Sequence, residues 1–467
     1  MIMHVKDIIT VKKIIPYGFV VMLALTSCKV LQPHKMPDLS TDPKLYRELS
    51  QTDSANMADV PWRQIFTDPV LQKLIEEAIR NNPDLQIAVA RMEKTKANLR
   101  QSRQAFFPTL NANAGAVLNN KNSDGSGVME NYEIYGSSSW EIDIWGKLRS
   151  AKRANLAAFL ESEAYKQAVQ TALIANVANI YYTLLADDAK LRITEQTLAK
   201  RIDEVDAIQA LKDNDVVTGA DLVMSQANRY AAEVSIPDIK QSIYETENAL
   251  SILLGRNPGP IERGTLEGQE ISAGLKSGVP AQLLANRPDV KEAEFRFRYY
   301  FEMTNVARTY FYPSLTITAS GGFTETDLSK LFNITTLVWN VAGGLTQPLF
   351  NQGLNRQRLA NAMANEEEYL IAFKQSLLSA GAEVANAMHG YQTATEKMAL
   401  RELRILYLEK SVDFTMELLK YTSNTNYTDV LTAEVNLLAA QINLVNDKLE
   451  RLQSAVSLYQ SLGGGCK

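Results

Sequence analysis

Two long stretches of the chain contain neither glycine nor proline, the residues that most often end a helix. One lies between Gly146 and Gly219 and the other between Gly390 and Gly463. Apolar residues recur in both at steps of three and four, the spacing of helices that pack against neighbouring helices. Ordinary helices have about 10–14 residues, whereas about 65 residues would form a rod of about 100 Å. The pattern predicts unusually long helices with coiled-coil-like packing, for which a soluble coiled coil is the simplest alternative.

Four shorter segments alternate between apolar and polar residues. The first two are "TLNANAGAVLN" and "YEIYGSSSWEIDIW", and the others are "SLTITASGGF" and "LVWNVAGGLTQ". Alternation over about ten residues is typical of a tilted transmembrane strand whose polar side chains face a lumen. The polar residues that we expect to face this lumen are Asn111, Asn113, Glu133, Glu141, Asp143, Thr316, Thr318 and Asn340.

A soluble β-sandwich with one wet face fits any one of these strands equally well. It fits two hairpins poorly when each hairpin interrupts a helical run. Four strands cannot close a membrane barrel, which needs about eight, and an open sheet edge is not tolerated in a bilayer. Several chains must therefore share the barrel. Two chains would supply about eight strands and three about twelve, and the sequence leaves this number open.

The chain repeats the same phrases at a fixed distance. "NNPDL" and "NRPDV" are separated by 205 residues, as are "FFPTL" and "FYPSL". Later, "DLVMSQA" precedes "LLG" by the same 34 residues by which "DVLTAEV" precedes "SLG". The offset between these later phrases is 208 residues, so it has hardly drifted. We interpret the chain as an internal duplication in which each half holds a helix, a hairpin, a long helix, a tip turn and a return helix.

The breaker-rich segments place the boundaries of this organisation. We expect a signal peptide at 1–27, an irregular segment at 28–70, a first repeat at 71–255, a linker at 256–280, a second repeat at 281–463 and a tail at 464–467. The hairpins are expected at about 108–145 and 313–348, the long helices at about 147–212 and 353–421, and the return helices at about 220–254 and 428–462.

The amino terminus has the pattern of a secretory signal. Lysines precede the apolar run "IIPYGFVVMLAL", which is followed by "TSC". The ending "LTSC" resembles a lipobox, in which Cys28 becomes the first mature residue and carries lipid; a plain signal peptide with an incidental cysteine is the alternative. No later run of about 18 apolar residues is free of polar interruption, so we expect no membrane-spanning helix.

Enzyme chemistry has little support in this composition. The two cysteines, Cys28 and Cys466, exclude a disulfide framework and repeated CxxC metal sites. Three scattered histidines offer no metal cluster, and HExxH, GxSxG and Walker-type motifs are absent. A net charge of −5 argues against a nucleic-acid partner. We expect a non-enzymatic protein with no cofactor other than the lipid on Cys28.

Several segments resemble the TolC/OprM-type outer-membrane factors, especially the NodT-like lipoproteins of multidrug efflux systems. The resemblance covers nearly all of the mature chain and rests on "PWRQIFTDPVLQKLIEEAIRNNPDLQIAVARMEKTKANLRQSRQAFFPTL", "LLANRPDVKEAEFRFR" and "SWEIDIWGKLRSAKRA". It implies a homotrimer with a shared twelve-stranded barrel in the outer membrane of a Gram-negative bacterium, above a helical barrel in the periplasm. It also implies docking on a periplasmic membrane-fusion adaptor that connects to an inner-membrane pump of the RND type.

The resemblance also implies a gate at the tip turns. "TDVLTA" is similar to the family's "LDVLDA", whose aspartates form acidic rings at the periplasmic constriction; Asp429 matches the first aspartate and Thr432 replaces the second. Asp221 is the counterpart in the first repeat, and helix capping is the alternative role for both aspartates. The expected adaptor-docking residues at the tips are Asp215, Thr218, Gly219, Ser423 and Asn424.

The function expected from this reading is a passive exit duct for small molecules in a tripartite efflux system. Two alternatives remain. One is an outer-membrane duct of a type I-like protein-secretion system, and the other is a periplasmic coiled-coil adaptor or structural protein without a pore.

Overall fold

A computed structural model describes residues 30–35, 57–120, 128–271, 286–421 and 426–465. The expected signal peptide, Cys28, Ser423 and Asn424 lie outside these residues. The chain divides into two compact units, one made of residues up to 38, 93–161 and 294–372, and the other of 39–92, 162–293 and 373–467.

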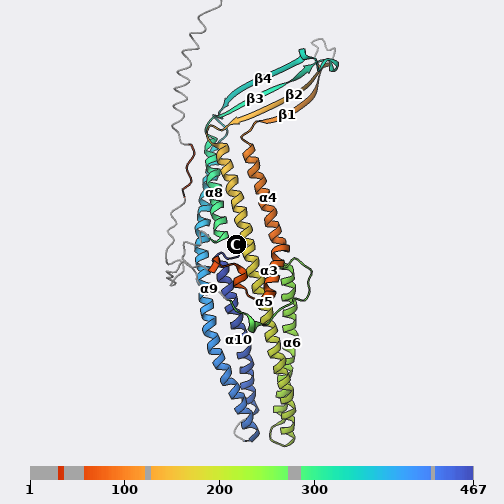
Figure 1. Cartoon of the computed structure of the whole chain (residues 1–467), viewed down its shortest axis with the longest axis vertical. Coiled ribbons are helices and arrows are strands. Elements are labelled where there is room, and N and C mark those ends of the chain that lie inside the picture. Colours follow the sequence, from red (N-terminus) through yellow and green to blue (C-terminus); the bar gives the residue numbers. More distant parts are fainter. Residues whose placement is uncertain (1–29, 36–56, 121–127, 272–285, 422–425, 466–467) are drawn as a thin grey trace, which may run out of the picture. The chain divides into compact units, whose positions relative to one another are not determined.

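The first unit holds a four-stranded antiparallel sheet in the order β1-β2-β3-β4 (Figure 1). Its strands are β1 (Thr109–Asn120), β2 (Val128–Ile142), β3 (Ser314–Glu325) and β4 (Leu337–Thr346). Two short 3-10 turns, η4 (Leu328–Lys330) and η5 (Ile334–Thr336), connect β3 to β4. β2 pairs directly with β3, so the hairpins of the two repeats form one continuous sheet.

Helices make up most of the remaining described chain. They are η2 (Met57–Asp59), α2 (Trp62–Ile65), α3 (Pro69–Asn81), α4 (Pro83–Gln104), α5 (Lys147–Asp213), α6 (Gly219–Leu253), η3 (Leu266–Gly268), α8 (Pro288–Thr309), α9 (Leu354–Tyr421) and α10 (Tyr427–Ser461). The two long helices, α5 and α9, have 67 and 68 residues. α3 precedes the Pro-Asp helix of the first repeat and was not expected as a separate helix.

In the second unit, each long helix packs against a return helix. Arg201 of α5 donates to the main-chain carbonyl of Asn228 in α6 at 2.6 Å. Lys397 of α9 pairs with Glu450 of α10 at 2.7 Å. The core of this unit is mainly aliphatic and also holds large aromatic side chains, since Tyr181 and Tyr182 of α5 and Phe66 after α2 are almost completely buried. Packing of apolar faces therefore stabilises helices of this length, with ion pairs along the helix pairs.

In each repeat, the end of the return helix lies against the start of the Pro-Asp segment. Gly255, just after α6, has a φ of +67°, and a Cβ there would lie 2.5 Å from the carbonyl oxygen of Asn81. Gly463, just after α10, has a φ of +89°, and a Cβ there would lie 2.5 Å from the carbonyl oxygen of Asn286. Both positions need glycine because the backbone is left-handed and a neighbouring chain approaches closely. "LLG" and "SLG" thus recur because each return helix ends against the entry of a Pro-Asp helix.

Candidate functional site

The register of the sheet places seven of the predicted lumen residues on one face. Directly opposite residues in an antiparallel pair share a face. Asn111 lies opposite Ser137, Ser137 opposite Ser320, and Ser320 opposite Asn340. The remaining members follow at even steps along the same strands: Asn113, Glu133, Glu141, Thr316 and Thr318. Side chains on this face also bond each other, as the Asn113 amide donates to the Ser137 hydroxyl at 3.1 Å.

Asp143 does not belong to this polar face. β2 ends at Ile142, so Asp143 lies outside the strand. Its carboxylate accepts hydrogen bonds of 3.0 Å from the main-chain N–H groups of Leu148 and Arg149, and it pairs with the Arg149 side chain at 3.1 Å. These N–H groups are among the donors that the first turn of α5 leaves unpaired. Asp143 therefore stabilises the beginning of the long helix, which corrects its place in the strand pattern.

The opposite face of the sheet is apolar. It exposes large side chains, with Leu110 82%, Trp339 75% and Leu345 66% accessible. Among the described residues, β1 and β4 each have one edge without a partner strand. A sheet with one polar face, one exposed apolar face and two open edges is incomplete as a single chain, because these edges and this face need a partner or a lipid environment.

The first tip turn joins α5 to α6 and is a complete capping box. The Thr218 hydroxyl accepts from the main-chain N–H of Asp221, and the Asp221 carboxylate accepts from the N–H of Thr218 at 2.8 Å. Asp215 has a φ of +57°, a left-handed conformation that few residues other than glycine adopt. Gly219 begins α6. Four of the predicted tip residues thus build one turn.

The second tip turn repeats the capping box at the start of α10. The Asn426 side chain accepts from the N–H of Asp429 at 3.2 Å, and the Asp429 carboxylate accepts from the N–H of Asn426 at 3.4 Å. Thr432 donates its hydroxyl to the carbonyl of Thr428 at 2.8 Å within its own helix. Asp221 and Asp429 therefore occupy equivalent capping positions, and Thr432 lies one turn further along.

An apolar cluster joins the two helix pairs close to these turns. Its buried members come from all four helices: Ile208, Leu222, Leu419, Tyr427 and Val430. The cluster fixes the two tip turns in one body, because its members touch across helix pairs of both repeats.

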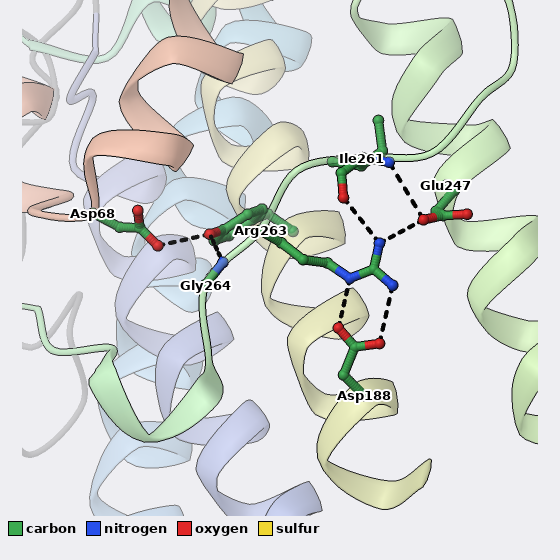
Figure 2. A network of polar contacts seen from close by, with 7 residues as sticks. Asp68, Asp188, Glu247, Ile261, Arg263 and Gly264 are labelled. Carbon is green, nitrogen blue, oxygen red and sulfur yellow. Dashed lines mark hydrogen bonds and ion pairs between the residues drawn. The ribbon is translucent and has the colours of Figure 1, made fainter. Parts of the chain in front are cut away.

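A polar network holds the linker that follows α6 (Figure 2). Arg263 of this linker pairs with Asp188 of α5 at 2.5 and 3.0 Å and with Glu247 of α6 at 2.5 Å. The hydrogen bond from the guanidinium to Asp188 raises the Arg263 pKa further above its ordinary value. The permanently charged Arg263 thus ties the linker to both α5 and α6.

The same network extends to the start of α3 through Tyr181. Its hydroxyl donates to the Asp68 carboxylate at 2.7 Å and accepts from the N–H of Gly264 at 3.1 Å. Burial of the ring, followed by its bond to Asp68, raises the Tyr181 pKa above its ordinary value, so the hydroxyl stays protonated. Arg263, Asp188 and Tyr181 were not predicted as a network, because a lone arginine in a linker carries no motif.

No helix within the described residues is long and apolar enough to cross a membrane. The same residues contain no cluster of three or more histidine, cysteine, aspartate or glutamate side chains able to hold a metal ion.

The family model described as "Outer membrane efflux protein" matches residues 74–256 and 279–464. The chain belongs to this family. The two matches coincide with the two repeats and leave the linker between them. The membership confirms the predicted resemblance and the internal duplication, and it identifies the chain as a channel protein rather than an enzyme. As an outer membrane efflux protein, it is an outer-membrane component of an efflux pump system.

Relatives and solved structures agree with this family. The probable efflux pump outer membrane protein TtgC of Pseudomonas putida is 29% identical over 425 residues, which cover 89% of this chain and 88% of the relative. The cation efflux system protein CusC of Escherichia coli strain K12 is 27% identical over 462 residues, covering 97% and 99%.

The fold is shared with solved channels of the family. The CusC structure superposes with a TM-score of 0.85 at 24% identity, covering 93% of this chain and 99% of that one. The open state of the MtrE outer membrane channel of Neisseria gonorrhoeae has a TM-score of 0.84 at 25% identity, covering 94% and 99%. The predicted TolC-like fold, with four antiparallel strands and long helices in two repeats, is confirmed.

Proposed function

We propose that this outer membrane efflux protein is a passive exit duct whose wall is built from three copies of the chain. The observation that supports the proposal is the two-faced sheet with open edges at β1 and β4. Three copies of the four strands would close a barrel of twelve, with the polar face toward a water-filled lumen and the apolar face toward lipid. A passive duct does not drive transport, so a partner pump would supply the energy.

Neighbouring residues on β3 offer a direct test of the two faces. Thr318 lies on the polar face and Ala319 on the apolar face. Thr318→Lys should leave membrane insertion intact and shift the ion selectivity of the purified protein toward anions in planar bilayers. Ala319→Lys should impair insertion by about 2–4 kcal/mol near the bilayer midplane. The proposal is wrong if the two variants behave alike, or if the wild-type protein forms no ion-conducting pore.

The assembly is proposed as a homotrimer that works with a periplasmic membrane-fusion adaptor and an inner-membrane pump of the RND type. The names of the relatives support an efflux role, since they describe toluene and cation efflux proteins. These names favour efflux over a secretion duct, and the family description favours a channel over a coiled-coil protein without a pore. Native mass spectrometry of the detergent-purified protein should give three copies. Genes for a secretion ATPase beside this one, instead of an RND pump, would favour secretion.

A lipid on Cys28 would anchor the chain beside the barrel in the outer membrane. The described chain begins at Val30, and the main chain of Gln32 exchanges two hydrogen bonds of 3.0 Å with the Asn305 side chain of α8. This segment belongs to the unit that carries the sheet. A lipid two residues earlier would therefore be held by the sheet-bearing unit. Cys28→Ser protein should lose incorporation of radiolabelled palmitate, and continued labelling would contradict the proposal.

Asp429 is proposed to supply the charge of the periplasmic gate, with Asp221 as its counterpart. Each is also a capping residue, so the test must separate charge from helix stability. Asp429→Ala removes both, whereas Asn426→Ala removes the cap and keeps the charge. If Asp429 gates, only Asp429→Ala should weaken block of the pore by divalent cations. Equal effects of the two variants would leave Asp429 as a cap alone. The tip residues Asp215, Thr218, Gly219, Ser423 and Asn424 are proposed to contact the adaptor.

A further inference from the structure

Two carboxyl side chains, Glu204 and Glu434, lie beside the apolar cluster near the tip turns, although charged groups do not contribute to apolar packing. Ile208 of α5 and Val430 of α10 are both completely buried in that cluster. Glu204 lies one helical turn before Ile208, and Glu434 lies one turn after Val430. Residues four apart share a helix face, so the packing of Ile208 against Val430 directs Glu204 and Glu434 into the same interior. A pair of acids therefore closes the side of the cluster that lies away from the tips.

Glu204 lies among nearly dry, incompletely hydrogen-bonded groups, whereas Glu434 is half-buried. Glu204 is 6% exposed, and its Oε1 has no hydrogen-bond partner within the described part of the chain. The Tyr427 hydroxyl, on a side chain that is 2% exposed, donates to the Glu204 carboxylate. Arg201 is 5% exposed; it donates to the Asn228 carbonyl of α6 at 2.6 Å, and its Nε has no partner in the described chain.

The cations and hydrogen-bonding groups around the pair come from three helices. α5 contributes Arg201 and Lys200, and α10 contributes Tyr427, while α6 offers the Asn228 carbonyl. Burial, followed by the charge and hydrogen bond of Glu204, raises the pKa of Glu434 from its ordinary value to about 8, against the opposing effect of the two cations. Burial raises the Tyr427 pKa as well, so this hydroxyl stays a donor.

We infer that Glu204 and Glu434 form a proton-operated latch that holds α5 against α10 behind the tip turns. With one shared proton, the neutral carboxyl of one acid donates to the carboxylate of the other, and the helix pairs of the two repeats stay together. Without that proton, the buried carboxylate of Glu204 and the half-buried carboxylate of Glu434 repel each other. Lys200 is exposed, so the buried guanidinium of Arg201 is the main cation beside them and offsets only one carboxylate. The inference rests on the proposed channel function, because separation of the helix pairs at the tips would widen the periplasmic end of the duct.

The direction of the pH dependence follows from the raised pKa. An acid whose folded pKa is raised stabilises a contact fully only below its ordinary pKa, and the contact weakens as the pH rises through the folded value. The latch should therefore be closed in acid, weaken as the pH rises toward about 8, and be released above that value. Its closing equilibrium should fall by up to about tenfold per pH unit in each chain below about pH 8, and by about tenfold in total between about pH 7 and about pH 9.

The experiment measures single-channel conductance of the purified full-length protein in planar bilayers from about pH 6 to about pH 10. Wild-type protein should show an open probability that rises by about tenfold or more from about pH 6 and levels off above about pH 8. Glu434→Gln, which keeps the shape of the neutral acid, should stay in the low-conductance state over the whole range. Glu409→Gln, which removes an exposed carboxylate of α9, should behave like the wild type. A pH-independent wild-type pore, or an unchanged profile in Glu434→Gln, would overturn the inference.

Amide hydrogen exchange of the same protein in detergent gives a second, independent readout. Exchange across Tyr427–Glu434 should accelerate by about tenfold more than the chemical rate predicts between about pH 7 and about pH 9, and Glu434→Gln should abolish this excess. If no pore forms at any pH, the channel proposal fails while exchange still tests the latch. If pores form but exchange shows no excess in the wild type, the latch fails and the channel stands.

Discussion

Replacing Arg263 by methionine should release the linker after α6 from the two helices that hold it. The guanidinium has a side-chain exposure of 20% and pairs with Asp188 and Glu247, whose side chains are 34% and 14% exposed. Methionine keeps the length and the apolar stem and removes only the charge and its donors. The two carboxylates would then be left partly buried without a cation, which is the costly way to break such a pair.

The magnitude follows from the burial of each partner. Removing one partner of a fully buried pair costs about 3–5 kcal/mol. One third of the Asp188 side chain is exposed, and solvent partly screens its contact with Arg263, so we expect about 2–4 kcal/mol for Arg263→Met. Arg192 provides the matched control, because it pairs with the linker residue Glu267 at exposures of 52% and 48%. Arg192→Met should cost at most about 1 kcal/mol.

Limited proteolysis of the folded protein measures this difference directly. A protease that cuts the linker only when it opens reports the opening equilibrium, so about 2–3 kcal/mol between the two variants corresponds to roughly a hundredfold in cleavage rate. Arg263→Lys should recover part of the protection, since lysine restores the charge without the two-pronged geometry. The reasoning would be refuted by equal cleavage of the Arg263→Met and Arg192→Met proteins.

Three further changes test other parts of the fold. Gly322→Ala should block assembly of the sheet, because its Cβ would lie 2.1 Å from the carbonyl oxygen of Ile134. In the control Gly321→Ala, the new Cβ meets nothing closer than 3.7 Å, so this variant should assemble normally. Assembly is measured as the heat-modifiable mobility of the protein in a gel. Asp215→Gly should stabilise the first tip turn by about 0.5–1 kcal/mol in thermal unfolding, because glycine accepts the left-handed conformation without strain; a lower midpoint would contradict this. Tyr181→Phe should cost about 1–3 kcal/mol by the same measurement, since the Asp68 carboxylate and the Gly264 N–H both lose a partner.

The long helices and the faces of the strands were predictable because both depend on local periodicity. A helix needs only a breaker-free run with apolar residues at steps of three and four. A strand face needs only alternation, which is why Asn111 and Asn340 share a face although the pairing between them was unknown. Alternation does not show where a strand ends, however. The pattern continued through Asp143, whereas the chain turns into α5 there with Gly146 at a φ of +83°.

The acid pair and the linker network could not be predicted in the same way. Glu204 and Glu434 have the spacing and composition of ordinary helix-surface carboxylates, and a charge on a long helix is usually solvated. Their burial follows from the rotation of α5 against α10, which is fixed by the packing of Ile208 and Val430. Contacts between distant helices depend on that rotation, and no local pattern encodes it. The role of Arg263 could not be predicted for the same reason, because its partners lie on two other elements.

Capping and gating are compatible roles for the aspartates of the two tip turns. An ionised carboxylate can accept about four hydrogen bonds, and a capping box uses one of these on the N–H of the N-cap residue. Accepting this bond leaves the carboxylate charged, and the charge lies at the turn, where Asp429 is exposed. The bond back to the N-cap is 2.8 Å in the first repeat and 3.4 Å in the second, so Asp221 contributes more to its cap than Asp429 does. If a charge at the constriction controls passage, Asp429 of the second repeat is therefore the residue whose charge can act there with less loss of stability in its own helix.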